Sequence, residues 1–210
     1  GSWRNIMSLL PYASLTHRRK GFRATADIVL LSSQTADGDN LISFLTLDWF
    51  SSTYCELIFK WYNINGVTDA NEMGISFSTN SDGSTADYNQ SAVTSTAFAA
   101  SHPESDSSTS LSYETGRDLA QATSSKAVTM NTGSGSDESS SGEFHFFNPS
   151  STTYVKHFWG RDASYGDDSS INDLHFAGYV NTTTAINGVK FDMQVGGAFD
   201  GKIKLWGVKA

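Results

Sequence analysis

The sequence predicts an all-β fold, an antiparallel β-sandwich of the jelly-roll type. Short apolar segments with period-two alternation recur along the chain, clusters of Gly, Asn, Asp and Ser separate them, and no segment shows a sustained helical stripe. A length of 210 residues, 38% hydrophobic and 17% charged, is sufficient for one shared core. We therefore expect a single sandwich domain over residues 25–210.

Four segments in the first half of the chain have the composition of strands. The clearest is 54–63, where Cys55, Leu57, Phe59 and Trp61 share one face and charged side chains point to the other. This alternation is typical of a strand with one face buried. The other segments are 28–31, 41–47 and 73–77, with turn-forming clusters at 37–40 and 79–84.

The middle of the chain is small and polar. We expect long surface loops around residues 91–110 and 131–142, because both stretches are dominated by Ser, Thr, Gly and acidic residues. The segment between them leaves two alternatives open, since 117–121 fits one helical turn or an irregular sheet edge. Residues 126–130 have the pattern of a strand.

Strand patterns resume towards the C-terminus. Each is bounded by Asn, Gly, Pro or Asp, and they cover residues 143–148, 154–161, 173–180, 189–195 and 202–208. Together with the earlier segments they give about eight to ten strands, the number of a sandwich or jelly roll.

Charge is distributed unevenly along the chain. The net charge is −8, yet the first 23 residues hold Arg4, Arg18, Arg19, Lys20 and Arg23 and no acid, so the remainder carries −13. We predict that residues 1–24 form a basic, partly apolar arm that attaches to an acidic surface of a neighbouring protein or to a sister protomer; a solvated, frayed terminus is the alternative. The acidic body is expected to repel nucleic acid, and no apolar run reaches the ~20 residues of a membrane span.

Motifs of catalysis are scarce. His145, His157 and His175 fall in different strand segments and could converge on a metal, but independent histidines are the favoured interpretation. The acidic pairs Asp137-Glu138 and Asp167-Asp168 lie in Ser- and Gly-rich stretches and are expected to be solvating charges rather than a glycosidase pair. We therefore expect no enzyme activity, no catalytic residue, no cofactor and no metal.

Two acidic turns offer oxygen atoms of the kind that calcium accepts. They are residues 37–40 (DGDN) and 80–83 (NSDG), and neither has the spacing of an EF-hand. The same residues are what tight turns require, so ordinary turns are the preferred interpretation.

The sequence also predicts the burial or exposure of several single residues. Cys55 is the only cysteine and is expected to be a small buried hydrophobe. Phe59 and Trp61 are predicted core residues. Trp49, Trp159 and Tyr165 border polar turns and are predicted to be exposed, where they could contact a glycan or a subunit.

Several strand-and-turn motifs resemble a known family. They are 54–63, 77–79 (FST) and 81–84 (SDGS) upstream, followed by 142–149 (GEFHFFNP), Tyr154, 188–191 (GVKF) and 201–209 (GKIKLWGVK). Together they resemble a β-sandwich module in virion proteins of tailed bacteriophages, particularly marine and cyanophage-type ones, found in tail fibres and capsid decorations. The likeness covers roughly residues 25–210 and is weakest over 91–130.

The resemblance implies a non-enzymatic phage virion protein, placed on the tail as a fibre or receptor-binding component. A capsid decoration or cement protein is the alternative, and a polysaccharide-cleaving tailspike is a less favoured third. The family implies a homo-oligomer, with a trimer favoured, and no catalytic residues. With this resemblance, the neighbour to which residues 1–24 attach is expected to be another virion protein. A host surface glycan is a further candidate partner.

Overall fold

The computed structural model describes residues 27–46, 48–80, 87, 88 and 90–210. The predicted arm of residues 1–24 and the turn at 81–84 lie outside the described residues. The described chain forms strands that are listed here in order: β1 Ile28–Asp39, β2 Leu41–Leu45, β3 Tyr54–Gly66, β4 Met73–Ser78, β5 Val93–Pro103, β6 Ser110–Tyr113, β7 Leu119–Ala122, β8 Lys126–Ala127, β9 Ser140–Phe147, β10 Lys156–Tyr165, β11 Ser170–Val180, β12 Gly188–Met193 and β13 Phe199–Lys209.

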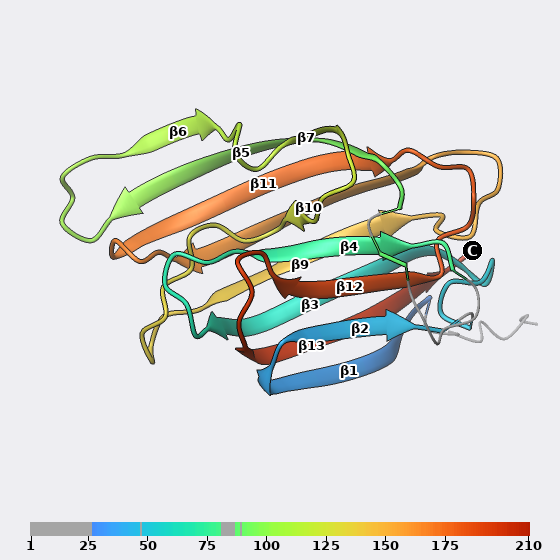
Figure 1. Cartoon of the computed structure of the whole chain (residues 1–210), viewed down its shortest axis with the longest axis horizontal. Helices are drawn as coiled ribbons and strands as arrows, with labels where there is room; N and C mark the ends of the chain where they lie inside the picture. The colour runs from blue at the N-terminus through green and yellow to red at the C-terminus, as the bar shows by residue number, and fades with distance from the viewer. Residues whose placement is uncertain (1–26, 47, 81–86, 89) are drawn as a thin grey trace, which may run out of the picture.

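The strands form two antiparallel sheets that pack face to face (Figure 1). The larger sheet has nine strands in the order β1-β13-β3-β9-β10-β11-β5-β6, and β7 also pairs with β5. The smaller has four strands in the order β2-β12-β4-β8. The first five strands alternate between the sheets, which is the winding typical of a jelly roll. The prediction of an all-β sandwich is confirmed.

Aromatic rings fill the space between the sheets. Phe144 of β9 is fully buried, and its ring lies 5.5 Å from that of Phe158 and 5.9 Å from that of Phe59, measured between centroids. Phe77 of β4 joins them from the smaller sheet at 6.1 Å. Tilted and offset contacts of this kind stabilise rings beyond their burial alone. The predicted core residues Phe59 and Trp61 are both fully buried.

One glycine makes room for these rings. Gly160 of β10 lies opposite both Phe144 and Phe176 on the neighbouring strands. A Cβ atom at this position would come 2.3 Å from Cζ of Phe176 and 2.6 Å from the carbonyl oxygen of Glu143. A side chain here would therefore displace a buried ring or the strand backbone.

The smaller sheet covers only part of the larger one. In Figure 1, β2, β12 and β4 lie over β13, β3 and β9, while the chain around β7 and β8 crosses the half that contains β10, β11 and β5. Val128 of this crossing segment is fully buried, and Leu119 and Met130 also pack against the core. We call residues 117–132 the strap, because they close the sandwich where the smaller sheet ends.

The prediction of a loop over residues 91–110 is wrong for most of that segment. Residues 93–103 form β5, which pairs with β11 from Val93↔Val180 to Pro103↔Ser170. Its inward side chains include Ala97 and Ala99, both buried opposite the larger Phe176 and Leu174. A strand whose inward residues are alanines lacks the strong apolar alternation from which strands are predicted.

The ambiguous middle is also resolved. Residues 119–122 form a short edge strand rather than a helical turn, and the strand expected at 126–130 is limited to β8. Within the loop predicted at 131–142, strand β9 begins at Ser140.

No helix in the described part of the chain has the length and apolar character of a membrane-spanning segment.

We predict that Phe144→Ala destabilises the protein by roughly 3–5 kcal/mol, because it removes a ring that contacts both sheets and leaves a cavity. Urea unfolding followed by tryptophan fluorescence measures the change. Leu111→Ala, at a side chain that is 76% exposed, is the control and should change the free energy of unfolding by less than about 0.5 kcal/mol. Equal effects of the two substitutions would contradict the inter-sheet core.

Candidate functional site

The candidate site is the face of the nine-stranded sheet that turns away from the smaller sheet, which we call the outer face. Along β10, buried and exposed residues alternate without interruption from Lys156 to Ser164. His157, Trp159, Arg161 and Ala163 therefore point outward. The cross-strand pairs place His145 beside Trp159, and Tyr179 beside His157, on this face.

An aromatic hollow lies on the outer face over β9, β10, β11 and β5. It has a volume of roughly 500 Å³. Its walls include Phe147, Trp159 and Tyr179, and its floor is made of small residues such as Thr96 and Ala177. The hollow exists because two neighbouring strands carry small side chains where their partners carry rings.

The indole of Trp159 is held in a fixed orientation. It stacks on the imidazole of His145, with centroids 3.9 Å apart and planes inclined by 10°. Nδ1 of His145 is in turn hydrogen-bonded to Oε1 of Glu56. Since His145 covers one side of the indole, the other side turns towards Ala177 on the opposite neighbouring strand and into the aromatic hollow. Trp159 is 42% exposed and offers this free face to a ligand.

Charged pairs continue the outer face beyond the hollow. Nζ of Lys60 lies 2.9 Å from Oε2 of Glu143, and Arg161 donates two hydrogen bonds of 2.7 and 2.8 Å to Asp173. The hydrogen bond from Lys60 lowers the pKa of Glu143, and the hydrogen bonds from Arg161 lower the pKa of Asp173. Both carboxyl groups are therefore anions across the neutral range.

The three histidines share the outer face but have separate partners. His145 stacks on Trp159, and His157 lies 6.2 Å from the ring of Tyr179. His175 stacks on Phe98 and lies 3.3 Å from Asp173. Within the described residues, no group of three or more His, Cys, Asp or Glu side chains has an arrangement that could hold a metal ion.

The acidic pairs lie in loops. Asp137, Asp167 and Asp168 are exposed, whereas Glu138 accepts a hydrogen bond of 2.6 Å from the backbone of Gly135. The DGDN segment turns between β1 and β2, with Gly38 at a φ of 73°. In this turn the carboxylate of Asp39 accepts a hydrogen bond from the backbone N–H of Asp37. Residues 81–83 of the second acidic turn lie outside the described residues.

Three of the single-residue expectations need correction. Cys55 is only half-buried, with Sγ 3.5 Å from the carbonyl oxygen of Lys209, rather than fully buried. Trp49 is also half-buried, because it packs against the core beside Phe44 at a centroid distance of 6.1 Å. Tyr165 is half-buried, and its hydroxyl donates to Glu104 at 3.2 Å.

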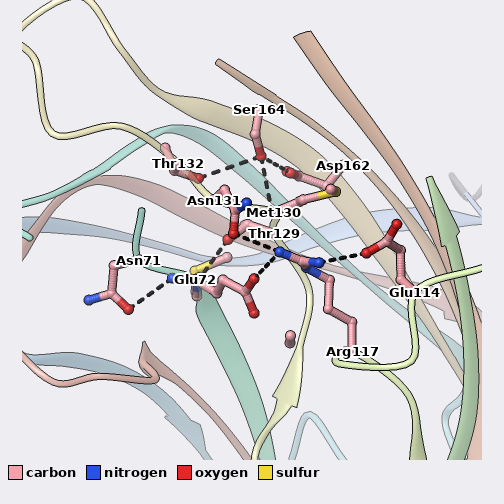
Figure 2. Close-up of polar contacts among 12 residues, drawn as sticks. Asn71, Glu72, Glu114, Arg117, Thr129, Met130, Asn131, Thr132, Asp162 and Ser164 are labelled. Carbon is pink, nitrogen blue, oxygen red and sulfur yellow. Dashed lines mark hydrogen bonds and ion pairs between the residues drawn. The ribbon is translucent and has the colours of Figure 1, made fainter. Parts of the chain in front are cut away.

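A buried polar cluster lies beneath the outer face, towards the strap. Asp162 is fully buried and accepts hydrogen bonds from Nε1 of Trp61, at 2.8 Å, and from the hydroxyls of Ser140 and Ser164. Figure 2 shows Ser164 also reaching Thr132 and the backbone of Met130. Burial raises the pKa of Asp162 to about 7, against the opposing effect of these hydrogen bonds.

The same cluster continues to Arg117 at the start of the strap (Figure 2). Its guanidinium pairs with Glu72, lies 2.7 Å from Glu114 and donates to Oδ1 of Asn131 at 2.7 Å. Burial raises the pKa of Glu72, and the Arg117 charge opposes that rise. Arg117 thereby joins the strap to the segment that leads into β4.

Lys126 is the other buried charge of the strap. Its Nζ donates to the carbonyl oxygens of Arg117, at 2.7 Å, and Ala127, at 2.6 Å, and lies 5.0 Å from the centroid of the Phe176 ring. Burial lowers the pKa of Lys126 to about 7. The cluster is thus a structural clamp, since its groups are directed at one another and not at the outer face.

Sequence reasoning selected Trp159 for exposure but missed the rest of the hollow. Tyr179 and Phe147 come after stretches of sequence that contain buried residues. The floor residues Thr96 and Ala177 have no chemical property that marks a binding site. The available signal for the outward position of Trp159 was the period-two alternation of residues 156–164. It places Phe158 and Trp159 on opposite faces of the strand. Which strands neighbour β10 could not be read from the chain.

Comparisons with known proteins supply no relative. No protein-family model, no curated protein and no solved structure matches the chain. The functional argument therefore depends on the outer face and on the motifs described above.

We predict that Asp162 makes the fold less stable as the pH rises from about 4 to about 7. The folded pKa of about 7 exceeds the ordinary value of 3.8, so the folded state binds the proton more tightly. Its stabilising effect is complete below 3.8 and declines towards pH 7, by up to about 1.4 kcal/mol per pH unit. Glu72, whose pKa burial also raises, acts in the same direction as Asp162, whereas Lys126, with a lowered pKa, acts above pH 7 and so outside this window.

Asp162→Asn should flatten this decline, because the amide cannot ionise yet can still accept from Trp61. Urea unfolding at intervals between pH 4 and 7 measures the slope for each variant. Asp137→Asn, at an exposed loop position, is the control and should retain the wild-type slope. A wild-type slope in the Asp162 variant would show that this carboxyl does not control the pH dependence.

Proposed function

We propose that the chain is a non-enzymatic receptor-binding component of a bacteriophage virion, which holds a host surface glycan in the aromatic hollow. The observation that carries the proposal is the free face of Trp159, fixed by His145 above a floor of small residues. Sugar rings present apolar C–H faces that stack on aromatic rings, while their hydroxyl groups form hydrogen bonds with nearby polar groups. Tyr179 in the wall and Thr96 in the floor of the hollow provide such groups.

The position of the hollow on strands suits a binding role. Trp159 and Tyr179 belong to adjacent strands that pair along their full length, so their backbones are fixed before a ligand arrives. A preorganised site loses little conformational entropy on binding. The volume of roughly 500 Å³ lies in the range of small-molecule sites.

The pKa values and positions of the carboxyl groups favour glycan binding over glycan cleavage. A glycosidase requires one carboxylic acid with a raised pKa beside the scissile bond. On the outer face, Glu143 and Asp173 have lowered pKa values because Lys60 and Arg161 hydrogen-bond to them. Asp162 has a raised pKa but is fully buried beneath the sheet.

The virion assignment rests on the resemblance of the strand motifs. Most of those motifs lie in β3, β9, β12 and β13 and at the end of β4, whereas Tyr154 lies in a loop and residues 81–84 lie outside the described residues. A capsid decoration protein is the second candidate. It is favoured by exposed apolar side chains where β6 ends the larger sheet, namely Leu111 and Tyr113 with the neighbouring Phe98. Such an edge is suited to contact with another subunit.

We predict that Trp159→Ala weakens glycan binding at least tenfold, since one aromatic stacking contact contributes roughly 1–1.5 kcal/mol beyond the burial that is also lost. Binding is measured on an array of bacterial envelope polysaccharides and then by calorimetry with the best ligand. Tyr113→Ala removes an exposed ring that does not line the hollow and is the matched control. Loss of binding in both variants, or in neither, would contradict the assignment, as would release of new reducing ends.

The location in the particle is a separate prediction. Antibody labelling of intact phage particles, viewed by electron microscopy, should mark the tail at low copy number. Labelling across the capsid surface would instead support the decoration protein and reject the tail assignment.

A further inference from the structure

A second feature of the outer face is an excess of lysines at its other end. Lys204 of β13 lies directly opposite Lys60 of β3, and both point outward. Lys202 follows on the same face of β13. Like charges directly opposite each other on adjacent strands destabilise a sheet.

The lysines are only partly neutralised. Lys60 pairs with Glu143, but neither Lys202 nor Lys204 takes part in any ion pair described for the structure. Nζ of Lys204 instead lies 5.4 Å from the centroid of the Tyr62 ring. Asp200, the nearest acid along β13, accepts a hydrogen bond of 2.7 Å from the backbone of Gly38 in the β1–β2 turn.

The excess contrasts with the rest of the body. Residues 24–210 carry a net charge of −13, and much of their positive charge is internal. Lys126 and Lys156 are fully buried, and the guanidinium of Arg117 is nearly so. The exposed cations of the outer face are Lys60, Arg161, Lys202 and Lys204, while Lys209 ends β13. Glu143 and Asp173 pair with Lys60 and Arg161, so the unpaired positive charge of this face lies at Lys202 and Lys204. These two lysines form a local patch on an acidic protein that can attract an anion.

Two further hollows lie between the lysines and β10. One of roughly 390 Å³ is lined by Tyr62, Lys202 and Lys204, and Gly201, whose φ is 132°, leaves part of its wall without a side chain. Another of the same volume contains Tyr62 together with Lys60, Glu143 and Arg161. Tyr62 belongs to both, and Arg161 is two residues from Trp159 on β10.

The dimensions indicate an extended ligand. Strands β9 and β3 separate β10 from β13, so Trp159 and the β13 lysines are about 14 Å apart in the direction across the sheet. The register places Lys204 two residues, and Lys202 four residues, further along the strand direction than Trp159. A single sugar ring cannot span this separation, whereas a short run of linked rings can. Trp159 lies at one end, and the ammonium groups of Lys202 and Lys204 lie beside Tyr62 at the other.

We propose that the outer face binds an acidic polysaccharide, with one ring stacked on Trp159 and the carboxylate or sulfate groups of later residues at Lys202 and Lys204. This inference rests on the proposed glycan-binding function and adds the charge class and direction of the ligand. The lysines form charge-assisted hydrogen bonds to the acidic groups, which relieves the repulsion between Lys204 and Lys60.

The test uses polymers that share a backbone and differ in charge. Polygalacturonate is compared with its methyl ester, and dextran sulfate with dextran, by calorimetry with the full chain at low salt. We expect the acidic member of at least one pair to bind at least tenfold more tightly. Raising the salt concentration should reduce this preference, because screening weakens contacts between exposed charges.

Variants then assign the preference to the lysines. The double substitution Lys202→Gln with Lys204→Gln should remove the preference for the acidic polymer, with a loss of about tenfold or more in affinity. Lys209→Gln, on the same strand but outside the hollows, is the matched control and should retain it. Thermal melting verifies that both variants are folded.

Each remaining outcome has a defined meaning. Equal binding of charged and neutral polymers, still dependent on Trp159, would overturn the acidic ligand and leave the glycan-binding function standing. Binding of none of the four polymers would overturn the acidic ligand, and the array of envelope polysaccharides then tests the glycan-binding function separately. A single-stranded oligonucleotide that binds as tightly as the acidic polymer would show a general polyanion surface and overturn the saccharide assignment.

Discussion

The packing of Phe144 between the two sheets is the interaction on which the rest of the structure depends. Its contacts with Phe59 and Phe158 hold β3, β9 and β10 in register from the inside. Because side chains alternate along a strand, the same register fixes His145 and Trp159 on the outside. The outer face is therefore as rigid as the core beneath it. A site of this kind needs no loop closure to form.

The half of the sandwich that the smaller sheet leaves uncovered is stabilised differently. There the strap covers the larger sheet through the nearly buried Arg117, the buried Lys126 and the groups around Asp162, all of which form hydrogen bonds. Buried polar groups of this kind contribute little net stability, but the loss of one partner leaves another unsatisfied. They define one position for the strap, whereas apolar contacts alone would allow it to slide. The cost is a sensitivity to pH around neutrality.

The sequence was informative wherever one face of a strand is strongly apolar. Residues 54–63 predicted β3 and its buried Phe59 and Trp61 because large and charged side chains alternate there. The same reasoning failed for β5, whose inward alanines make it resemble a loop. The buried charges were also missed, since nothing in the chain distinguishes Lys126 or Asp162 from surface residues. The hollow depends on the neighbours of β10, which only the folded sheet defines.

The central claim is that the outer face, and not the rest of the sandwich, meets the ligand. Nuclear magnetic resonance of the tryptophan indole N–H groups during titration with an acidic oligosaccharide tests it most directly. The account predicts a large shift for Trp159, on the outer face, and little change for Trp61, whose indole is buried against Asp162. A shift confined to Trp49, or none at Trp159 under saturating ligand, would contradict it.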